Sequence, residues 1–438
     1  MRMVDIIEKK AGCEPLSSEE IQFFIDGFVS GDIPDYQASA LLMAIVLNDM
    51  NEREAADLTL HMMHSGDTVD LSDLPGVKVD KHSSGGVGDT TTLVVAPLVA
   101  ACGGTVAKMS GRGLAFSGGT IDKLESIPGV NISQTIERFK QIVRKTGVCV
   151  IGQTGNLVPA DKKMYALRDV TGTVQSVPLI AASIMSKKLA AGADAIVLDV
   201  KVGSGAFMKT VEDAKRLAEL MVKMGKLLKR EVVAVVTDMN QPLGLSVGNA
   251  LEFREAVQLL SGQIPENDPL YEICLLLGTQ MLLLSKLAKT DDEARGMLKH
   301  AIENGSGLEK LRSMIHEFGG DASLVTLKGM DQLCTTRRQV PVPAKNSGYI
   351  VGMQTELIGR AAQVLGAGRA TKEDVIDPAV GLVMHKRVGD RVEQGDAICT
   401  LYVNDESNLA DAMETMTEAV RIGEKPKFVT PMVYAVIR

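Results

Sequence analysis

The spacing of hydrophobic and polar positions divides the chain into three stretches, and the first is helical. Residues 1 to about 66 have the pattern of helices. Residues 17–20 (SSEE) and 51–54 (NERE) match a capping box, in which the first side chain and the glutamate three positions on satisfy free amides. Residues 35–50 are too long and too apolar for a surface helix. We expect this segment to be buried, either inside the protein or at a subunit interface.

From Gly76 the pattern changes to short β-branched runs that alternate with glycines and helical segments. The candidate strands are GVKVD, TVAKMS, GVCVIG, DAIVLDVKV and VVAVVTD. Strands that alternate with helices predict parallel βαβ units. A helical insertion over about residues 161–191 interrupts them, and we expect it to pack on the N-terminal helices.

These patterns predict an α/β protein with a mixed, mostly parallel sheet domain, a small all-helical domain and a C-terminal α+β domain. A length of 438 residues fits two or three cores better than one. The expected domains are helical (1–66 and about 161–191), α/β (67–160 and 192–335) and C-terminal (336–438).

Residues 377–403 have the hairpin pattern of biotinyl and lipoyl carrier domains. A carrier needs a modifiable lysine on an exposed turn, and neither EAMKM nor a comparable motif occurs. Lys386 and Arg387 are therefore expected on a solvated turn without a carrier function.

Composition and charge narrow the classes of protein that fit. Apolar residues make up 45% of the chain and charged residues 23%, as in ordinary globular proteins. The formal net charge of −8 argues against non-specific nucleic-acid or anionic-membrane binding. The six cysteines form no CxxC pair, which predicts neither a zinc site nor a disulfide framework. With no signal-peptide pattern and a longest apolar run (93–102) of about half a membrane span, we expect a cytoplasmic protein.

Two neighbouring glycine-rich segments carry the chemistry. In KVDKHSSGGVGDTTTLVVAPL a strand precedes the glycines and a helix follows them, with Asp89 or Thr90 as N-cap. Bare backbone amides and a helix N-terminus favour an anion, although neither the Walker A order nor GxGxxG is present. A second unit, TVAKMS–GRGLAFSGG–TIDKLESI, follows at once.

Each loop alone could be only a tight turn. Parallel strands, however, bring such loops together at their carboxyl ends, where open α/β sheets bind ligands. Two loops in succession with flanking hydroxyls therefore predict one phosphate site. Its candidate ligands are Lys81, Ser83, Thr92, Ser110 and Thr120.

These two segments, together with YALRDVTGTVQSVPLIAASIMSKKLA and DAIVLDVKVGSGAFM, resemble the thymidine and pyrimidine-nucleoside phosphorylase family over nearly the whole chain. Lys108 stands where thymidine-specific members tend to carry methionine, and Phe116–Ser117 replaces a His–Thr pair common there. Both differences favour the bacterial pyrimidine-nucleoside branch. The resemblance also adds Lys108 to the phosphate ligands.

The resemblance implies reversible phosphorolysis of uridine, thymidine or deoxyuridine to free base and (deoxy)ribose 1-phosphate. Its catalytic residues here would be His82, Arg168 and Lys187, and Arg168, Ser183 and Lys187 would bind the base. His82 would donate to the O2 side of the base, with a pKa that bound phosphate holds near the working pH. Ser183 and Lys187 are four apart and share a helix face, whereas a solvated Lys187–Lys188 pair accounts only for Lys188. Tyr165 could support the pocket.

Three aspartates near strand ends, Asp80, Asp161 and Asp199, could be mistaken for acid/base groups. Phosphate is already an anionic nucleophile and needs no general base. We therefore expect these carboxylates to hold basic residues or cap helices.

The family resemblance also implies a homodimer and a bound alkali ion, here potassium, with no organic cofactor. The matching ion ligands are Gly88, Thr90, Leu243, Ser246 and Glu255. An oxygen-rich set with one carboxylate suits a weakly charged hard cation better than zinc or a divalent ion.

Alternatives remain open at this point. A thymidine-specific phosphorylase would differ in its contacts near Lys108 and Phe207, which we expect to tune substrate choice. An anthranilate-type phosphoribosyltransferase would need magnesium carboxylates, and no acidic pair is placed for them. A non-catalytic nucleoside- or phosphate-binding regulator would bind without turnover.

Overall fold

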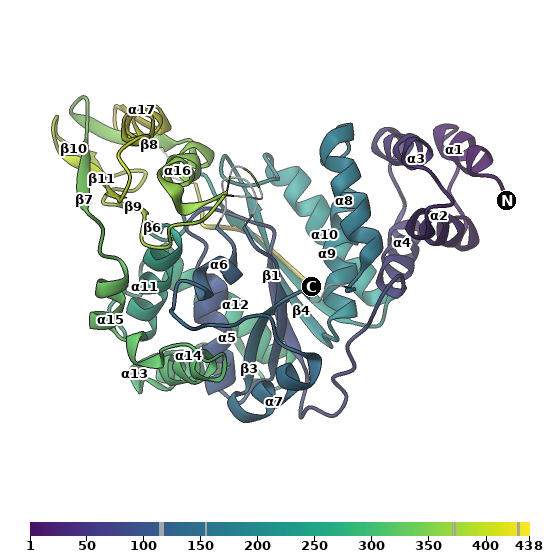
Figure 1. The fold of residues 1–438 in the computed structure, drawn as a ribbon, viewed down its shortest axis with the longest axis horizontal. Coiled ribbons are helices and arrows are strands. Elements are labelled where there is room, and N and C mark those ends of the chain that lie inside the picture. Colours follow the sequence, from purple (N-terminus) through teal and green to yellow (C-terminus); the bar gives the residue numbers. More distant parts are fainter. Residues whose placement is uncertain (114–117, 154–155, 370, 372–373, 427–429) are drawn as a thin grey trace.

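The computed structural model describes residues 1–113, 118–153, 156–369, 371, 374–426 and 430–438. Figure 1 shows the N-terminal helices at one end, a sheet with its helices in the middle, and the C-terminal strands and helices α16 (Thr355–Ala362) and α17 (Leu409–Ala419) at the other end. Among the described residues, no helix combines the length and apolar character that crossing a bilayer requires.

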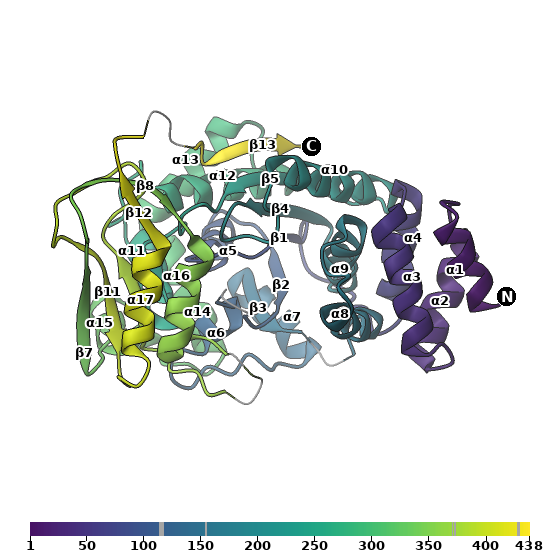
Figure 2. The same ribbon diagram turned by 90° about the horizontal axis from the view of Figure 1, so that it is seen from above.

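Four helices open the chain, and both predicted capping boxes are present, at Ser17–Glu20 and Asn51–Glu54. They are α1 (Met3–Ala11), α2 (Ser18–Ser30), α3 (Asp35–Asn48) and α4 (Glu52–His64). Two later helices, α8 (Pro159–Thr171) and α9 (Val177–Ala190), lie between these helices and the sheet (Figure 2), and α9 packs on α4. The predicted return of the helical insertion is confirmed.

All five predicted strands of the sheet domain form. They are β1 (Val79–Ser83), β2 (Val106–Ser110), β3 (Val148–Gly152), β4 (Ala195–Val202) and β5 (Glu231–Asp238). The pairs β1–β4, β4–β5 and β2–β3 are parallel, and a parallel bridge between Lys78 and Thr105 sets β1 beside β2. The buried β-branched residues of β4 and β5 explain why these strands lie at the centre, where both faces are covered.

The last strand, β13 (Val433–Ile437), pairs antiparallel with β5 and makes the sheet mixed. The hydrophobic pattern predicts these residues within the C-terminal domain, but their backbone hydrogen bonds place them in the central sheet (Figure 2). The sequence of β13 does not indicate its partner strand. The pairing depends on the free edge of β5, which exists only in the folded sheet.

Helices cover both faces of the sheet: α10 lies on one face, and α12 and α5 lie on the other. α5 is buried nearly all round, which matches its uniformly apolar sequence. The helices of this region are α5 (Thr91–Ala101), α6 (Thr120–Leu124), α7 (Ile136–Thr146), α10 (Val211–Leu227), α11 (Asn249–Leu260), α12 (Pro269–Leu284), α13 (Asp291–Glu303), α14 (Ser306–Glu317) and α15 (Leu327–Leu333).

The C-terminal region has its own hydrophobic core. Its strands are β7 (Arg338–Pro343), β8 (Gly348–Met353), β9 (Gly381–Met384), β10 (Arg391–Val392), β11 (Ala397–Val403) and β12 (Val420–Gly423). β6 (Ser246–Val247), from the chain before α11, joins the sheet of β9, β11 and β7.

The expectation of a solvated turn was wrong for Arg387. Its guanidinium donates to the carbonyls of Pro242 (3.2 Å) and Leu243 (3.1 Å) and pairs with Asp268 at 3.1 Å. β6 pairs with β9 and brings those acceptors to the turn, a contact between distant segments that spacing along the chain does not reveal.

Candidate active site

The carboxyl ends of β1 and β2 face α8 and α9 across a cavity of about 650 Å³. Both glycine-rich loops line it, as does the helix face that carries Ser183 and Lys187. The prediction that the two loops converge at one edge of the sheet is confirmed.

The first loop is shaped by Asp89. Its carboxylate accepts hydrogen bonds from the hydroxyls of Ser83 (2.5 Å) and Thr91 (2.5 Å) and from the Thr91 amide (3.2 Å). Burial alone would raise the pKa of Asp89, but Lys81, Lys201 and Lys123 hold it well below its ordinary value. Gly85 has φ +102°, which disfavours any other residue at this turn. The turn delivers the chain to the free amides at the start of α5.

Lys81, a predicted phosphate ligand, is held by groups of the protein itself. Its buried ammonium lies 3.6 Å from Asp199 and 3.9 Å from Asp89 and hydrogen-bonds the Thr91 hydroxyl. It is not among the described residues that line the cavity. Because successive strand residues point to opposite sides, Lys81 supports the loop from beneath while His82 faces the cavity.

The other predicted phosphate ligands do line the cavity. These are Ser83, Thr92, Lys108, Ser110 and Thr120. Phe116 and Ser117, which distinguish the two branches of the family in the sequence analysis, lie outside the described residues.

The second loop is held by Asp122, a residue that sequence analysis missed. Its buried carboxylate accepts from the Gly113 amide at 2.7 Å and from Arg112 at 3.2 Å. Arg369, from the C-terminal region, donates to the same carboxylate at 2.9 Å. The TIDKL motif marks Asp122 only as a first-turn residue of a helix; its remote partner has no signal in the sequence.

Lys108 lies at the floor of the cavity. Its ammonium is 3.2 Å from Asp80 and donates to the Lys81 carbonyl at 2.5 Å. Burial lowers the pKa of Lys108 to about 7, although Asp80 opposes the shift. The group therefore titrates close to neutral pH.

His82 lines the same cavity as Lys108. Burial lowers its pKa well below the ordinary value, and the charges of Lys188, Lys108, Lys187 and Lys81 act in the same direction. Without an anion in the cavity, His82 is therefore neutral at neutral pH. A bound anion would oppose the lysines and raise the pKa again.

The opposite wall contains the predicted base-binding residues. The Lys187 ammonium is 2.8 Å from Asp161 and 3.1 Å from the Ser183 hydroxyl, so the shared helix face is confirmed. Arg168 donates to three carbonyls, those of Thr173 (3.2 Å), Val174 (2.6 Å) and Leu179 (3.3 Å). These bonds fix the connection between α8 and α9. Tyr165 and Phe207 also line the cavity.

The expected ion-pair roles of the three aspartates are confirmed. Asp80 pairs with Lys108 and Lys188, Asp161 with Lys187, and Asp199 with Lys201 at 2.7 Å. The interpretation of Lys188 as a solvated residue was wrong. Its ammonium is buried against Asp80 on β1, a partner about a hundred residues away along the chain.

The predicted cation ligands lie on neighbouring segments. A side chain at Gly88, which has φ +63°, would come within 3.1 Å of the Ser246 carbonyl oxygen and 3.2 Å of that of Gly244. Glu255 accepts from the amides of Leu245 (2.6 Å) and Ser246 (3.3 Å). Burial raises the pKa of Glu255 to about 8. The buried Thr90 hydroxyl has no hydrogen-bond partner among the described residues, so these groups fit a small cation.

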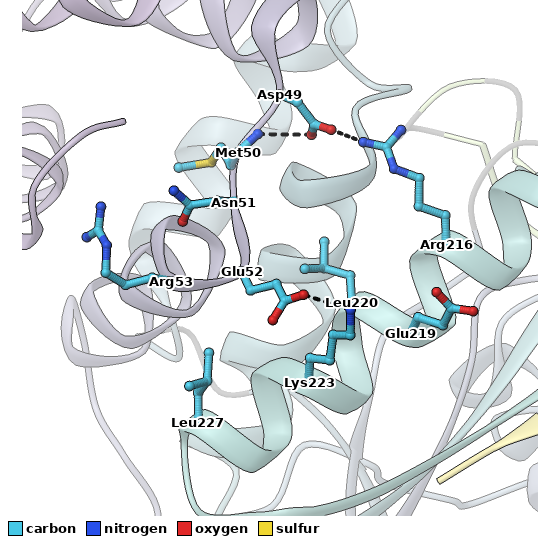
Figure 3. A pocket seen from close by; sticks show the side chains of 10 residues that line it. All are labelled: Asp49, Met50, Asn51, Glu52, Arg53, Arg216, Glu219, Leu220, Lys223 and Leu227. Atoms are coloured by element: carbon cyan, nitrogen blue, oxygen red, sulfur yellow. Dashed lines mark hydrogen bonds and ion pairs between the residues drawn. The ribbon is translucent and has the colours of Figure 1, made fainter. Parts of the chain in front are cut away.

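A second hollow of similar volume lies between the α3–α4 turn and α10 (Figure 3). Asp49 pairs with Arg216, and Glu52 pairs with Lys223 at 2.7 Å. The residues lining it include none of the predicted site residues.

Three family models match the chain in the order of its regions. A glycosyl transferase helical bundle domain matches residues 4–66, the α/β domain of that family matches 76–308, and a pyrimidine nucleoside phosphorylase C-terminal domain matches 349–423. The class that the fold and its two-walled cavity define is therefore this group of glycosyltransferases.

Within that class, the chain is 56% identical to the pyrimidine-nucleoside phosphorylase of Bacillus subtilis over 98% of each chain, and 53% identical to that of Geobacillus stearothermophilus over 99% of each. The chain belongs to the pyrimidine-nucleoside phosphorylase family. An anthranilate phosphoribosyltransferase from Thermus thermophilus matches with a TM-score of 0.60 at 19% identity, covering 72% of this chain and 99% of that one. That likeness shows a common fold and nothing more.

Proposed function

We propose that this protein catalyses the reversible phosphorolysis of pyrimidine nucleosides (uridine, thymidine or deoxyuridine) to free base and (deoxy)ribose 1-phosphate. One observation carries the proposal: a single cavity has anion-binding loops on one wall and the donors Arg168, Ser183 and Lys187 on the other. Relatives of more than half identity bear the name of this activity.

The reaction replaces the glycosidic bond with a bond to phosphate. A phosphate oxygen attacks C1′ of the sugar as the C1′–N bond breaks, and that bond's electrons pass to the pyrimidine. Loop amides, the hydroxyls of Ser83, Thr92, Ser110 and Thr120, and Lys108 hold the phosphate beneath the sugar. The attacking group brings its own negative charge, so none of the paired aspartates is needed as a base.

The base wall stabilises charge on the leaving pyrimidine. Lys187 and Arg168 are cations, and their interaction strengthens as negative charge grows on the ring. His82 donates a hydrogen bond at the O2 side of the base. With phosphate bound, the raised pKa of His82 lets it transfer a proton there as the bond breaks.

Potassium is the proposed ion for the set Gly88, Thr90, Leu243, Ser246 and Glu255. When bound, it would supply a positive charge that offsets buried Glu255. Arg387, which donates to the Leu243 carbonyl, would orient that ligand.

A homodimer is the proposed assembly, and the cytoplasm its location. Exposed apolar side chains gather on α1 and α3, where Val4, Tyr36, Met43 and Leu47 are between 36% and 74% exposed. A second copy would cover this face. Six free cysteines fit a reducing compartment.

Incubation with uridine, with and without phosphate, tests the activity by following free uracil. We expect release only with phosphate, without a need for magnesium. Equal release in its absence would reject phosphorolysis, and a requirement for a divalent ion would favour the phosphoribosyltransferase alternative. The same assay with thymidine measures the preference among substrates.

A further inference from the structure

Two adjacent lysines on α9 point to different parts of the molecule. Lys187 faces the cavity between Asp161 and Ser183. Lys188 crosses from the helical region to the sheet, where its ammonium is 2.9 Å from Asp80 on β1 and donates to the Met109 carbonyl on β2 at 3.0 Å. One side chain of the base-binding helix therefore contacts both phosphate-binding strands.

Asp80 also pairs with Lys108, so it connects Lys188 to that residue. Its carboxylate lies 3.2 Å from Lys108, and the side chains of Lys108, Asp80 and Lys188 are 3%, 1% and 5% exposed. Two buried ammonium groups share one buried carboxylate beside the predicted phosphate site. Such burial is costly unless partners hold the charges in good geometry. Removing one member would displace the other two.

Other ion pairs join the same two regions, but they are exposed. Asp49–Arg216 and Glu52–Lys223 (Figure 3) have side chains that are 45–54% exposed. Solvent screens such pairs, and they lie outside the active-site cavity. The Lys188–Asp80 ion pair, in contrast, is buried beside the active-site cavity.

We propose that Lys188 is a positioning residue that couples the two walls of the site, by tying α9, with its base-binding Ser183 and Lys187, through Asp80 to Lys108 and the end of β2. This inference rests on the proposed function. Its consequence is that phosphate and pyrimidine help each other to bind, because each orders one end of the same buried contact.

Calorimetric binding of inorganic phosphate, alone and with saturating uracil, tests the coupling. In the wild-type protein, uracil should raise phosphate affinity by about fivefold or more. In Lys188→Met, that enhancement should vanish and phosphate alone should bind about tenfold more weakly, because Asp80 and Lys108 lose their partner. Lys187→Met should leave the affinity for phosphate alone within about twofold.

A second readout reports on the electrostatic surroundings of His82, which Lys188, Lys187, Lys108 and Lys81 face. Loss of the Lys188 charge should raise the pKa of His82, followed by NMR in the absence of phosphate. A lysine that only stabilises the fold would lower the melting temperature without removing the effect of uracil. Lys328→Met, at an exposed position of α15, is the matched control and should match wild type in every measurement.

Two outcomes would overturn the coupling. One is independent binding of phosphate and uracil in the wild-type protein, a measurement that does not depend on a variant that folds. The other is an unchanged enhancement in a folded Lys188→Met. If the wild-type protein releases uracil from uridine only with phosphate, either result counts against the coupling alone; if it does not, the proposed function itself has failed.

Discussion

The two walls of the active-site cavity are built by different means. The phosphate wall consists of two glycine-rich loops whose shapes are set by Asp89 and Asp122, with hydroxyl side chains and Lys108 beside them. The base wall consists of side chains on α8 and α9, such as Arg168 and Lys187, placed by contacts to carbonyls and to Asp161. In the proposed reaction the loops would hold an anion in place, whereas the side chains on α8 and α9 would offer charge to a group that becomes negative only as the bond breaks.

Removing a charge from the base wall should change activity the most and should leave the phosphate wall intact. Lys187→Met should lower kcat by about 10²–10³-fold, as when a donor to developing charge is removed elsewhere. The KM for phosphate should change little, since the loops are untouched. Steady-state kinetics with both substrates varied would measure this. If Lys187→Met instead kept its kcat and lost phosphate affinity, Lys187 would belong to the phosphate wall and the assignment to the base wall would be wrong.

The converse change weakens the phosphate wall. Asp89→Asn should raise the KM for phosphate by about 10²-fold, because the loop loses charged hydrogen bonds to Ser83 and Thr91. The KM for uridine should stay within about threefold. A melting curve checks that the fold survives. Equal losses for both substrates would mean that Asp89 does not act on one wall alone.

The phosphate wall should also respond to pH through Lys108. Burial lowers the pKa of Lys108 to about 7. A bound anion favours the cationic form, so binding takes up a proton, and affinity should fall about tenfold per pH unit above that pKa. The measurement should use sulfate as the competing anion, so that the titration of phosphate itself does not contribute to the pH dependence. Lys108→Met should bind weakly with no such slope; a slope that persists would assign it to another group.

The weakest response should come from the proposed cation site beside the first loop. Burial raises the pKa of Glu255 to about 8, so the carboxyl is mostly protonated at neutral pH, and a cation must displace that proton. Potassium affinity, followed by the rise in melting temperature, should increase about eightfold from about pH 7 to about pH 8.5. Glu255→Gln should lose this increase. The same pH dependence in that variant would argue against Glu255 as a ligand.

Much of the phosphate wall could be predicted from the sequence, because its parts are local. The glycines, hydroxyls and strand ends of residues 79–120 are consecutive, and period-two and helical patterns place them on strand, loop and helix. The five parallel strands follow for the same reason. Lys81 could not be placed, since a residue beside a glycine loop can point into the cavity or beneath the loop.

From the sequence alone follow the types and order of most elements and the glycine-rich pattern on which the prediction of an anion site depends. The partners of the buried charges emerge only in the folded chain: Lys188 lies against Asp80, Arg369 against Asp122, and Arg387 against the Leu243 carbonyl. The pairing of β13 with β5 also emerges only there. This difference arises because backbone conformation depends mainly on residues that are close in the sequence. A buried charge is satisfied by whichever partner the folded chain brings within hydrogen-bond distance, however remote in sequence.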